Sequence, residues 1–208
     1  MPVFTIDGSI GAGKSTILEY LHINYNLSVD VEPVQKWIPF LEKMYHDKKG
    51  AFEFQIRVWM DRCWIQPKNN VNILMERSPY FQKNVFVPAS FQNKIITESE
   101  NSILHEMYQK AINIWNPKGY IYLRANPDKC FERISKRSRE CEKDISIEYL
   151  RQLHNLHEQA YIMASTAGMP IICIDVEGKT VAKIAAEVWN ALHILGIANS
   201  KPSYKKKI

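Results

Sequence analysis

An α/β fold built on a five-stranded parallel sheet is predicted for this chain of 208 residues. Short runs rich in β-branched and aromatic residues alternate along it with longer stretches in which apolar residues recur at helical spacing. Parallel strands that alternate with helices are joined by right-handed crossovers, which place helices on both faces of the sheet. Hydrophobic residues make up 46% of the chain, which is enough for the core that this arrangement requires.

Five runs have the length and composition of buried strands, and each ends near polar or turn residues. They span residues 3–7, 27–34, 72–78, 119–124 and 169–176. No linker rich in Pro, Gly or Ser divides the chain, and no internal repeat is evident. We therefore expect one domain that covers residues 1–208.

Two of the intervening helices can be located with their ends. The stretch 97–115 has an apolar face, and Thr97 with Glu100 forms a capping-box pattern at its start. A second apolar stripe runs from Val181 to Leu192 and is followed by Gly196, a residue typical of helix C-caps.

Charge and targeting patterns narrow the classes of partner. Lys and Arg number 27 against 22 Asp and Glu, a net charge of +5 that is too small and scattered to indicate nucleic-acid binding. The run Lys205-Lys206-Lys207 predicts a flexible basic tail over residues 199–208. The sequence shows no signal-peptide pattern, no apolar run that could span a bilayer, and no C-x-x-C pair among its four cysteines. We expect a cytoplasmic protein with no membrane or nucleic-acid partner.

A glycine-rich motif follows the first predicted strand and precedes an amphipathic helix. It matches the pattern G-x-x-x-x-G-K-[ST], in which backbone N–H groups and the helix N-terminus surround a phosphate. Lys14 is expected to reach the β- and γ-phosphates, and the Ser15 hydroxyl to bind Mg²⁺. The motif predicts that ATP or GTP is bound by Gly8, Ser9, Ile10, Gly11, Ala12, Gly13, Lys14, Ser15 and Thr16.

Charged side chains also follow the second and third predicted strands. Glu32 precedes Pro33, which keeps its backbone extended, and Glu76-Arg77 ends the third strand. Because the carboxyl ends of parallel strands meet at one edge, these side chains are expected beside the glycine-rich loop. Glu32 could accept a proton from an attacking hydroxyl, Glu76 could face Mg²⁺, and Arg77 could hold Glu32. A solvated acid and a surface ion pair fit the same residues when each is taken alone.

A basic helix end follows the fourth predicted strand. Arg133 and Arg137 are four residues apart and share one helix face, and Arg139 precedes the charged stretch 140–144. These residues fit a lid over about residues 137–146 that closes on a triphosphate. A solvated basic face would have the same pattern.

Taken in order, these motifs resemble the deoxynucleoside kinases, which include the herpes-type thymidine kinases and the cellular deoxycytidine and deoxyguanosine kinases. The resemblance covers nearly the whole chain. Besides the glycine-rich loop it rests on Glu32-Pro33-Val34 with Trp37, Met44-Tyr45, Phe54-Gln55, Glu76-Arg77-Ser78, Tyr122-Leu123-Arg124, the Arg-x-Arg pair and residues 153–158. It implies a P-loop kinase fold, ATP with Mg²⁺, transfer of phosphate to a deoxynucleoside 5′-hydroxyl in nucleotide salvage, and a homodimer.

The resemblance also implies a role for each site residue. Glu32 would be the general base on the 5′-hydroxyl, and Arg77 would position that hydroxyl. Gln55 would read the base edge with its amide. The other implied contacts are Trp37 and Phe86 beside the base, Tyr45 and Glu142 at the sugar 3′-hydroxyl, and Arg133, Arg137 and Arg139 in the lid.

Base preference is where the chain departs from the family pattern. Two positions that tune the substrate fall at Arg62 and Gln82, where the deoxycytidine and deoxyguanosine kinases pair an arginine with an aspartate. A hydrogen bond between Arg62 and Gln82 would lack that second charge. Val58, one helical turn earlier, resembles the thymidine-accepting branch. We expect pyrimidine deoxynucleosides, thymidine included, as substrates, and the pattern leaves room for some purine tolerance.

Two other functions fit parts of the sequence. A thymidylate-type nucleoside monophosphate kinase has a similar length and loop, but it would need further basic groups beside Glu32 for the substrate's own phosphate. A catalytically inactive subunit with the kinase fold would be expected to have lost Lys14, Glu32 or Glu76, and all three are present.

Overall fold

The computed structural model describes residues 3–63, 72–115 and 117–197. At its centre lies a five-stranded, wholly parallel sheet in the order β2-β3-β1-β4-β5. The strands are β1 (Val3–Asp7), β2 (Ser28–Asp30), β3 (Ile73–Glu76), β4 (Gly119–Arg124) and β5 (Ile171–Asp175). The predicted α/β class and its five strands are confirmed.

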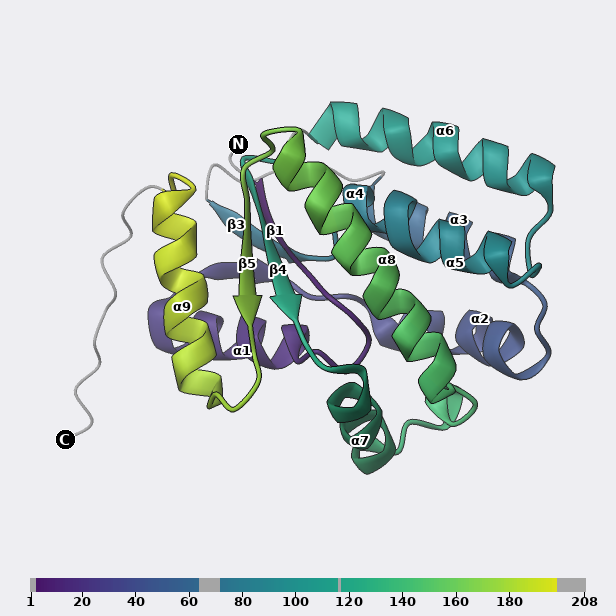
Figure 1. Cartoon of the computed structure of the whole chain (residues 1–208), viewed down its shortest axis with the longest axis horizontal. Helices are drawn as coiled ribbons and strands as arrows, with labels where there is room; N and C mark the ends of the chain where they lie inside the picture. The colour runs from purple at the N-terminus through teal and green to yellow at the C-terminus, as the bar shows by residue number, and fades with distance from the viewer. Residues whose placement is uncertain (1–2, 64–71, 116, 198–208) are drawn as a thin grey trace.

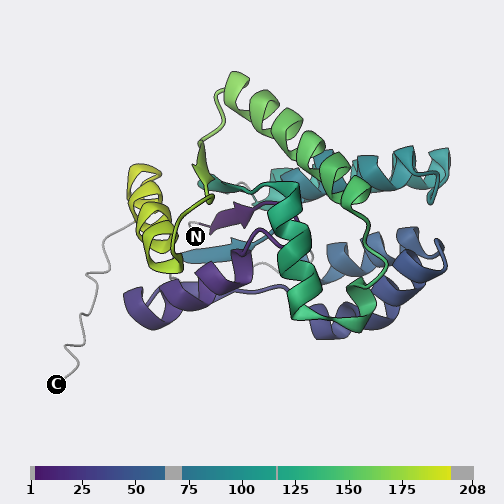
Figure 2. The same cartoon turned by 60° about the horizontal axis from the view of Figure 1, so that its bottom comes forward.

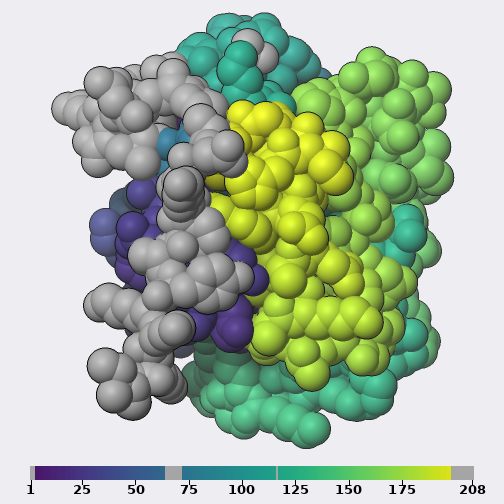
Figure 3. Space-filling view, turned by 90° about the vertical axis from the view of Figure 1, so that its left-hand side faces the viewer, coloured from purple at the N-terminus to yellow at the C-terminus, as the bar shows by residue number. Residues whose placement is uncertain are grey.

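Helices and shorter helical turns connect the strands. They are α1 (Lys14–Tyr25), α2 (Val34–His46), α3 (Ala51–Arg62), α4 (Pro79–Phe81), the π-helical turn η1 (Gln82–Phe86), α5 (Val87–Gln92), α6 (Glu98–Trp115), α7 (Pro127–Arg137), the 3₁₀ turn η2 (Glu140–Glu142), α8 (Ile147–Thr166) and α9 (Val181–Ile194). In Figure 2, α8 lies above the strands and α1 below them. Figure 3 shows α9 along one side of the molecule, between α1 and α8.

The adjacent strands β1 and β4 have the predicted bounds. The strand predicted at residues 27–34, in contrast, is shorter in the structure than expected. Residues 27–34 were expected to be extended, but β2 ends at Asp30. Beyond Asp30, the Glu32 backbone N–H donates to the side-chain carboxylate of Glu76 at 3.2 Å, in place of a backbone carbonyl of a neighbouring strand. Pro33, which has no N–H, then forms the N-cap of α2. The chain therefore leaves the sheet early and turns Glu32 toward the end of β3.

The predicted helix ends are confirmed. The Glu100 carboxylate accepts from the Thr97 backbone N–H at 2.6 Å, and the Glu100 N–H donates to the Thr97 hydroxyl at 3.3 Å. At the end of α9, Gly196 has φ +89° and donates to the His193 carbonyl at 3.1 Å. At both helix ends these hydrogen bonds satisfy backbone groups that have no partner within the helix: N–H groups at the start of α6 and a carbonyl at the end of α9.

Apolar side chains fill both faces of the sheet and a second region beneath α2, α3 and α6. Every residue of β1 is buried, as expected for the central strand of a sheet covered on both faces. The second region includes Trp37, Phe54 and Tyr108, so it joins buried side chains of all three helices.

Two sequence predictions concern the chain outside this core. The basic tail over residues 199–208 lies outside the described residues. Among the helices that the structure describes, none combines the length and the apolar character needed to cross a membrane.

Candidate active site

A cavity of about 330 Å³ opens where β1 and β3 end, between the glycine-rich loop, α2, α3, η1 and the turn after α7. In Figure 1 the arrowheads of β4 and β5 point toward α7, at the same end of the sheet. The predicted site residues that line the cavity are Ile10, Gly11, Gly13, Lys14, Ser15, Thr16, Glu32, Trp37, Tyr45, Gln55, Glu76, Arg77, Gln82, Phe86, Arg137, Arg139 and Glu142. Those that do not form part of its lining are Gly8, Ser9, Ala12, Arg62 and Arg133.

The glycine-rich loop has a shape that side chains would obstruct. Gly11 has φ +80°, and a Cβ there would lie 2.7 Å from the Cys130 carbonyl oxygen of α7. Gly13 has φ +95°, a backbone conformation that side chains rarely adopt, although a Cβ added there would have no atom within 4 Å. The hydroxyl of Ser9 is buried without a hydrogen-bond partner among the described residues. This concave loop with a buried polar atom is the form expected of a phosphate cradle.

Lys14 and the start of α1 place positive charge at this loop. The Lys14 ammonium is buried and donates to the carbonyls of Gly8 and Ser9, each at 3.0 Å. Burial, together with repulsion from Arg77, lowers the pKa of Lys14. In the described structure no side chain caps the N-terminus of α1, which begins after Gly13. A phosphate would satisfy both this helix end and the lysine.

A strained turn after β3 positions Arg77. Arg77 has φ +67°, a left-handed conformation that few side chains adopt. Its N–H donates to the Ile6 carbonyl at 2.9 Å, and the next N–H, from Ser78, donates to Asp7 at 2.7 Å. The last two residues of β1 therefore accept hydrogen bonds from two consecutive N–H groups of this turn and fix its conformation.

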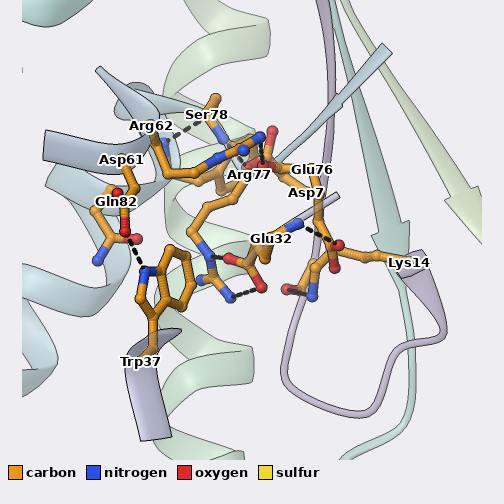
Figure 4. A network of polar contacts seen from close by, with 12 residues as sticks. Asp7, Lys14, Glu32, Trp37, Asp61, Arg62, Glu76, Arg77, Ser78 and Gln82 are labelled. Carbon is orange, nitrogen blue, oxygen red and sulfur yellow. Dashed lines mark hydrogen bonds and ion pairs between the residues drawn. The ribbon is translucent and has the colours of Figure 1, made fainter. Parts of the chain in front are cut away.

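From this turn the Arg77 guanidinium reaches Glu32. Its Nε donates to one carboxylate oxygen of Glu32, and its Nη2 lies 3.4 Å from the other. The guanidinium carbon also lies 4.0 Å from the centre of the Phe86 ring. Figure 4 shows Glu32 and Arg77 between Lys14 on one side and Trp37 with Gln82 on the other.

Two neighbouring carboxylates have opposite electrostatic environments. Burial alone would raise the pKa of Glu32, but the charge and hydrogen bonds of Arg77, with Lys14 beyond, outweigh it and lower that pKa. For Glu76, burial and the charge of Glu32 raise the pKa. Glu76 accepts from the Ser15 hydroxyl, with oxygen separations of 2.9 and 3.1 Å. A carboxylate and a hydroxyl placed in this way fit Mg²⁺, whose charge would favour the ionised form of Glu76.

At the far end of the cavity, Gln55 and Gln82 meet. The Gln82 amide donates to the Gln55 side-chain oxygen at 2.6 Å, and the Tyr108 hydroxyl donates to the Gln55 backbone carbonyl at 3.0 Å. The hydrogen bond that the sequence would allow between Arg62 and Gln82 is not among those of the described residues. Arg62 instead donates to the Asp30 carboxylate at 2.8 Å, because a charged acceptor outcompetes a neutral amide.

Aromatic side chains form the walls of the cavity. The Trp37 indole donates to Asp61 at 2.8 Å, which joins α2 to α3, and its ring meets Phe54 edge-on at 5.8 Å. Phe86 comes from η1, whose π-helical geometry brings both ends of the turn to the cavity. Tyr45 packs edge-on against Tyr149 at 6.1 Å between ring centres.

Two of the three arginines that were predicted to form a lid contact Glu142, the residue predicted to bind the sugar. Arg137 donates to the Glu142 carboxylate at 2.6 and 3.1 Å, and Arg139 lies 3.4 Å from its other oxygen. Arg133 lies beside the loop and donates to the Gly11 carbonyl at 3.2 Å. The three arginines therefore face the loop and Glu142 from a single segment.

Sequence reasoning missed two acidic residues that support the site, Asp7 and Asp61. Asp7 carries the contact to Ser78 described above, and its place directly before the glycine-rich motif was a usable signal. Asp61 holds Trp37 and also pairs with Arg57 at 2.8 Å. Its only signal in the sequence was the spacing of four residues from Arg57.

Comparisons with known proteins agree with this geometry. The family model described as deoxynucleoside kinase matches residues 4–193. Human mitochondrial thymidine kinase 2 is 30% identical over 187 residues, which cover 84% of this chain and 71% of that protein. A probable deoxycytidine kinase of fowlpox virus is 35% identical over 165 residues, which cover 74% of this chain and 69% of that protein.

A solved structure extends the agreement to the fold. Deoxyadenosine kinase from M. mycoides with bound dCTP superposes with a TM-score of 0.76 at 26% identity, covering 92% of this chain and 99% of that one. The parallel sheet is therefore that of the P-loop kinases. With the loop, the Glu32–Arg77 pair and the match over residues 4–193 in agreement, the chain belongs to the deoxynucleoside kinase family, whose members phosphorylate deoxynucleosides.

Proposed function

We propose that this protein transfers phosphate from ATP, with Mg²⁺, to the 5′-hydroxyl of a pyrimidine deoxynucleoside, thymidine included, in nucleotide salvage. We further propose that residues 1–208 act as one kinase domain with a lid at residues 137–146. The observation that carries the proposal is the partly buried Glu32–Arg77 pair, which shares one cavity with the glycine-rich loop. A partly buried carboxylate kept ionised beside a phosphate site is suited to accept the proton of an attacking hydroxyl.

The acceptor side of the reaction would depend on Glu32 and Arg77. Glu32 takes the proton of the 5′-hydroxyl as that oxygen attacks phosphorus. Arg77 holds the Glu32 carboxylate in place with two donors from one rigid guanidinium, so the base is oriented before substrate arrives. Tyr45 and Glu142 bind the sugar 3′-hydroxyl from the lid side of the cavity.

The donor side would depend on the loop and the lid. When bound, magnesium ATP supplies the phosphoryl group and a metal charge that favours its transfer. The loop and Lys14 would hold the phosphates, and Ser15 with Glu76 would hold the metal. Arg133, Arg137 and Arg139 add positive charge and exclude water when the lid closes.

Three features support a pyrimidine base. Trp37 and Phe86 provide flat apolar surfaces in the cavity, and Gln55 provides an amide with both a donor and an acceptor. Val58 is buried and lines the cavity one helical turn before Arg62. The two relatives described above are named as a thymidine kinase and a probable deoxycytidine kinase.

A substrate panel tests the proposal. Phosphate transfer from ATP is measured for the four deoxynucleosides and for thymidine monophosphate. We expect transfer to thymidine and deoxycytidine, and little to the monophosphate, because Glu32 would repel a second phosphate. Faster use of thymidine monophosphate would identify a monophosphate kinase, and no transfer to any acceptor would identify an inactive subunit. The homodimer stays a prediction, which sedimentation of the same sample checks.

Substitution of Glu76 by glutamine is expected to raise the Mg²⁺ concentration required for half-maximal activity by about tenfold or more. The substitution removes the negative charge that sits 2.9 Å from the Ser15 hydroxyl. Activity is titrated with Mg²⁺ at saturating ATP and nucleoside, with Glu106→Gln on the exposed face of α6 as the control. An unchanged Mg²⁺ requirement in a fully active Glu76→Gln protein would remove Glu76 from the metal site.

A further inference from the structure

Asp7 places a carboxyl group in the core, at the point where β1 passes into the glycine-rich loop. The residue is 1% exposed, and Phe4 and Ile6 of the same strand are fully buried apolar residues. Its Oδ2 is buried without a hydrogen-bond partner among the described residues, and burial raises the pKa of this carboxyl to about 6. An apolar side chain of the same size would avoid the cost of burying that oxygen. The role of Asp7 must therefore lie with its other oxygen.

That other oxygen, Oδ1, holds the turn that carries Arg77. It accepts from the Ser78 N–H at 2.7 Å, and the preceding N–H, from Arg77, donates to the Ile6 carbonyl at 2.9 Å. Arg77 has φ +67°, which is unfavourable for a residue with a Cβ, so contacts from outside the turn must maintain this conformation. Asp7 therefore ties the end of β1 to a strained arginine, and Figure 4 draws the two residues with Ser78 in one network.

Asp7 is itself fixed from the other side by β4. In the sheet it is paired with Tyr122. The next residue, Gly8, has φ +147°, and a Cβ there would lie 2.6 Å from the Leu123 carbonyl oxygen, so the start of the loop has no room to shift toward β4. The phosphate cradle and the Arg77 turn therefore both depart from Asp7, the cradle through its backbone and the turn through its side chain.

We propose that Asp7 is a positioning residue for phosphoryl transfer. By holding the turn after β3, it keeps the Arg77 guanidinium, and through it the Glu32 carboxylate, at a fixed place relative to the phosphate cradle. Asp7 acts here as a hydrogen-bond acceptor: the contact to Ser78 uses one oxygen, which a neutral amide offers as well. The inference rests on the proposed function, since it assumes that Glu32 takes the proton of the 5′-hydroxyl.

Three kinds of substitution separate this role from a role in the fold or a role of the charge. Asp7→Val keeps about the size of the side chain, suits a buried strand and removes the acceptor, and Asp7→Ala is carried in parallel as a second variant without an acceptor. Asp7→Asn keeps an acceptor oxygen and removes the charge. Tyr80→Phe is the control, because it removes a buried hydrogen bond of 2.9 Å to the Ala160 carbonyl from a residue outside the described lining of the cavity.

For each variant, kcat is measured at saturating ATP with the deoxynucleoside that the substrate panel shows to be used fastest. The Kd of that nucleoside is measured by calorimetry, and Tm by thermal unfolding. We expect Asp7→Val to lower kcat by about tenfold or more with a Kd within about threefold of wild type, because a misplaced base disturbs the reacting geometry more than binding. Asp7→Asn and Tyr80→Phe are expected to keep kcat within about threefold of wild type.

An Arg77→Lys background tests whether the effect passes through Arg77. Lysine lacks the rigid, planar group with which arginine holds a carboxylate at two points. In this background Asp7→Val is therefore expected to lower kcat by less than about threefold, the non-additivity of two residues that act as a unit.

Three kinetic results would overturn the inference: Asp7→Val turning over as fast as Tyr80→Phe, Asp7→Asn losing as much activity as Asp7→Val, or an equal loss with and without Arg77→Lys. It is also overturned if neither Asp7→Val nor Asp7→Ala folds, because Asp7 would then support the fold as a whole. Each of these outcomes leaves the proposed kinase activity intact. Absence of transfer by the wild-type protein to every nucleoside would instead overturn the proposed function, and this inference with it.

Discussion

Replacement of Glu32 by glutamine is expected to lower kcat by at least about a hundredfold, while the Kd for nucleoside changes little. Glutamine has nearly the same shape and can still accept from Arg77 through its oxygen. It cannot take up the proton that the 5′-hydroxyl must lose as it attacks phosphorus. The loss is therefore specific to turnover, which is the signature of a general base.

The measurement pairs steady-state kinetics with nucleoside binding by calorimetry. Glu42→Gln serves as the control, because it changes the same residue type on the exposed face of α2. Arg77 is partly buried and its charge would lose a partner, so thermal unfolding is recorded to show that Glu32→Gln is folded. Turnover close to that of the wild-type protein in a folded Glu32→Gln variant would assign the proton transfer to another group.

Acidification is expected to destabilise the protein strongly through His157. This side chain is 1% exposed, packs against the rings of Phe81 and Tyr122, which also contact each other, and has Nδ1 2.7 Å from the Leu153 carbonyl. Burial lowers its pKa from 6.5 to about 3. The folded protein therefore keeps His157 neutral at a pH where the unfolded chain protonates it.

The sign of the effect follows from proton binding. Below about pH 6.5 the unfolded state binds one more proton at this residue than the folded state, so the free energy of unfolding falls as the pH falls. The loss is about 1.4 kcal/mol for each pH unit, and it continues toward pH 3, where the folded form would also protonate. The contribution is fully present above about pH 6.5.

Urea unfolding at pH 7, 6, 5 and 4 measures this slope, with His157→Phe as the matched variant. Phenylalanine keeps an aromatic ring in the stack of Phe81 and Tyr122 and removes the titrating group. The variant is expected to lose less stability than the wild-type protein, by about 1.4 kcal/mol for each pH unit below 6.5. Equal slopes in the two proteins would show that His157 is protonated in the fold.

Features that depend on consecutive residues were predictable. The glycine-rich loop, the Thr97–Glu100 cap and the bounds of β1 and β4 all arise from chemistry within a few positions, so their residue types and spacing carry the information. The placement of Glu32 and Glu76 at one edge followed from parallel strands alone. The length of β2 could not be predicted in this way. It depends on whether the Glu32 N–H donates to a backbone carbonyl of a neighbouring strand or to the Glu76 carboxylate.

The sequence by itself determined the α/β class, the phosphate loop and the residue types that a kinase site requires. Only the tertiary structure decided which partners these residues have: Arg62 pairs with Asp30, Gln82 with Gln55, and Glu142 with both Arg137 and Arg139. Each choice is a competition among side chains brought together by strand order and helix packing. Its outcome depends on distances of a few tenths of an ångström, which the spacing of residues along a chain does not encode.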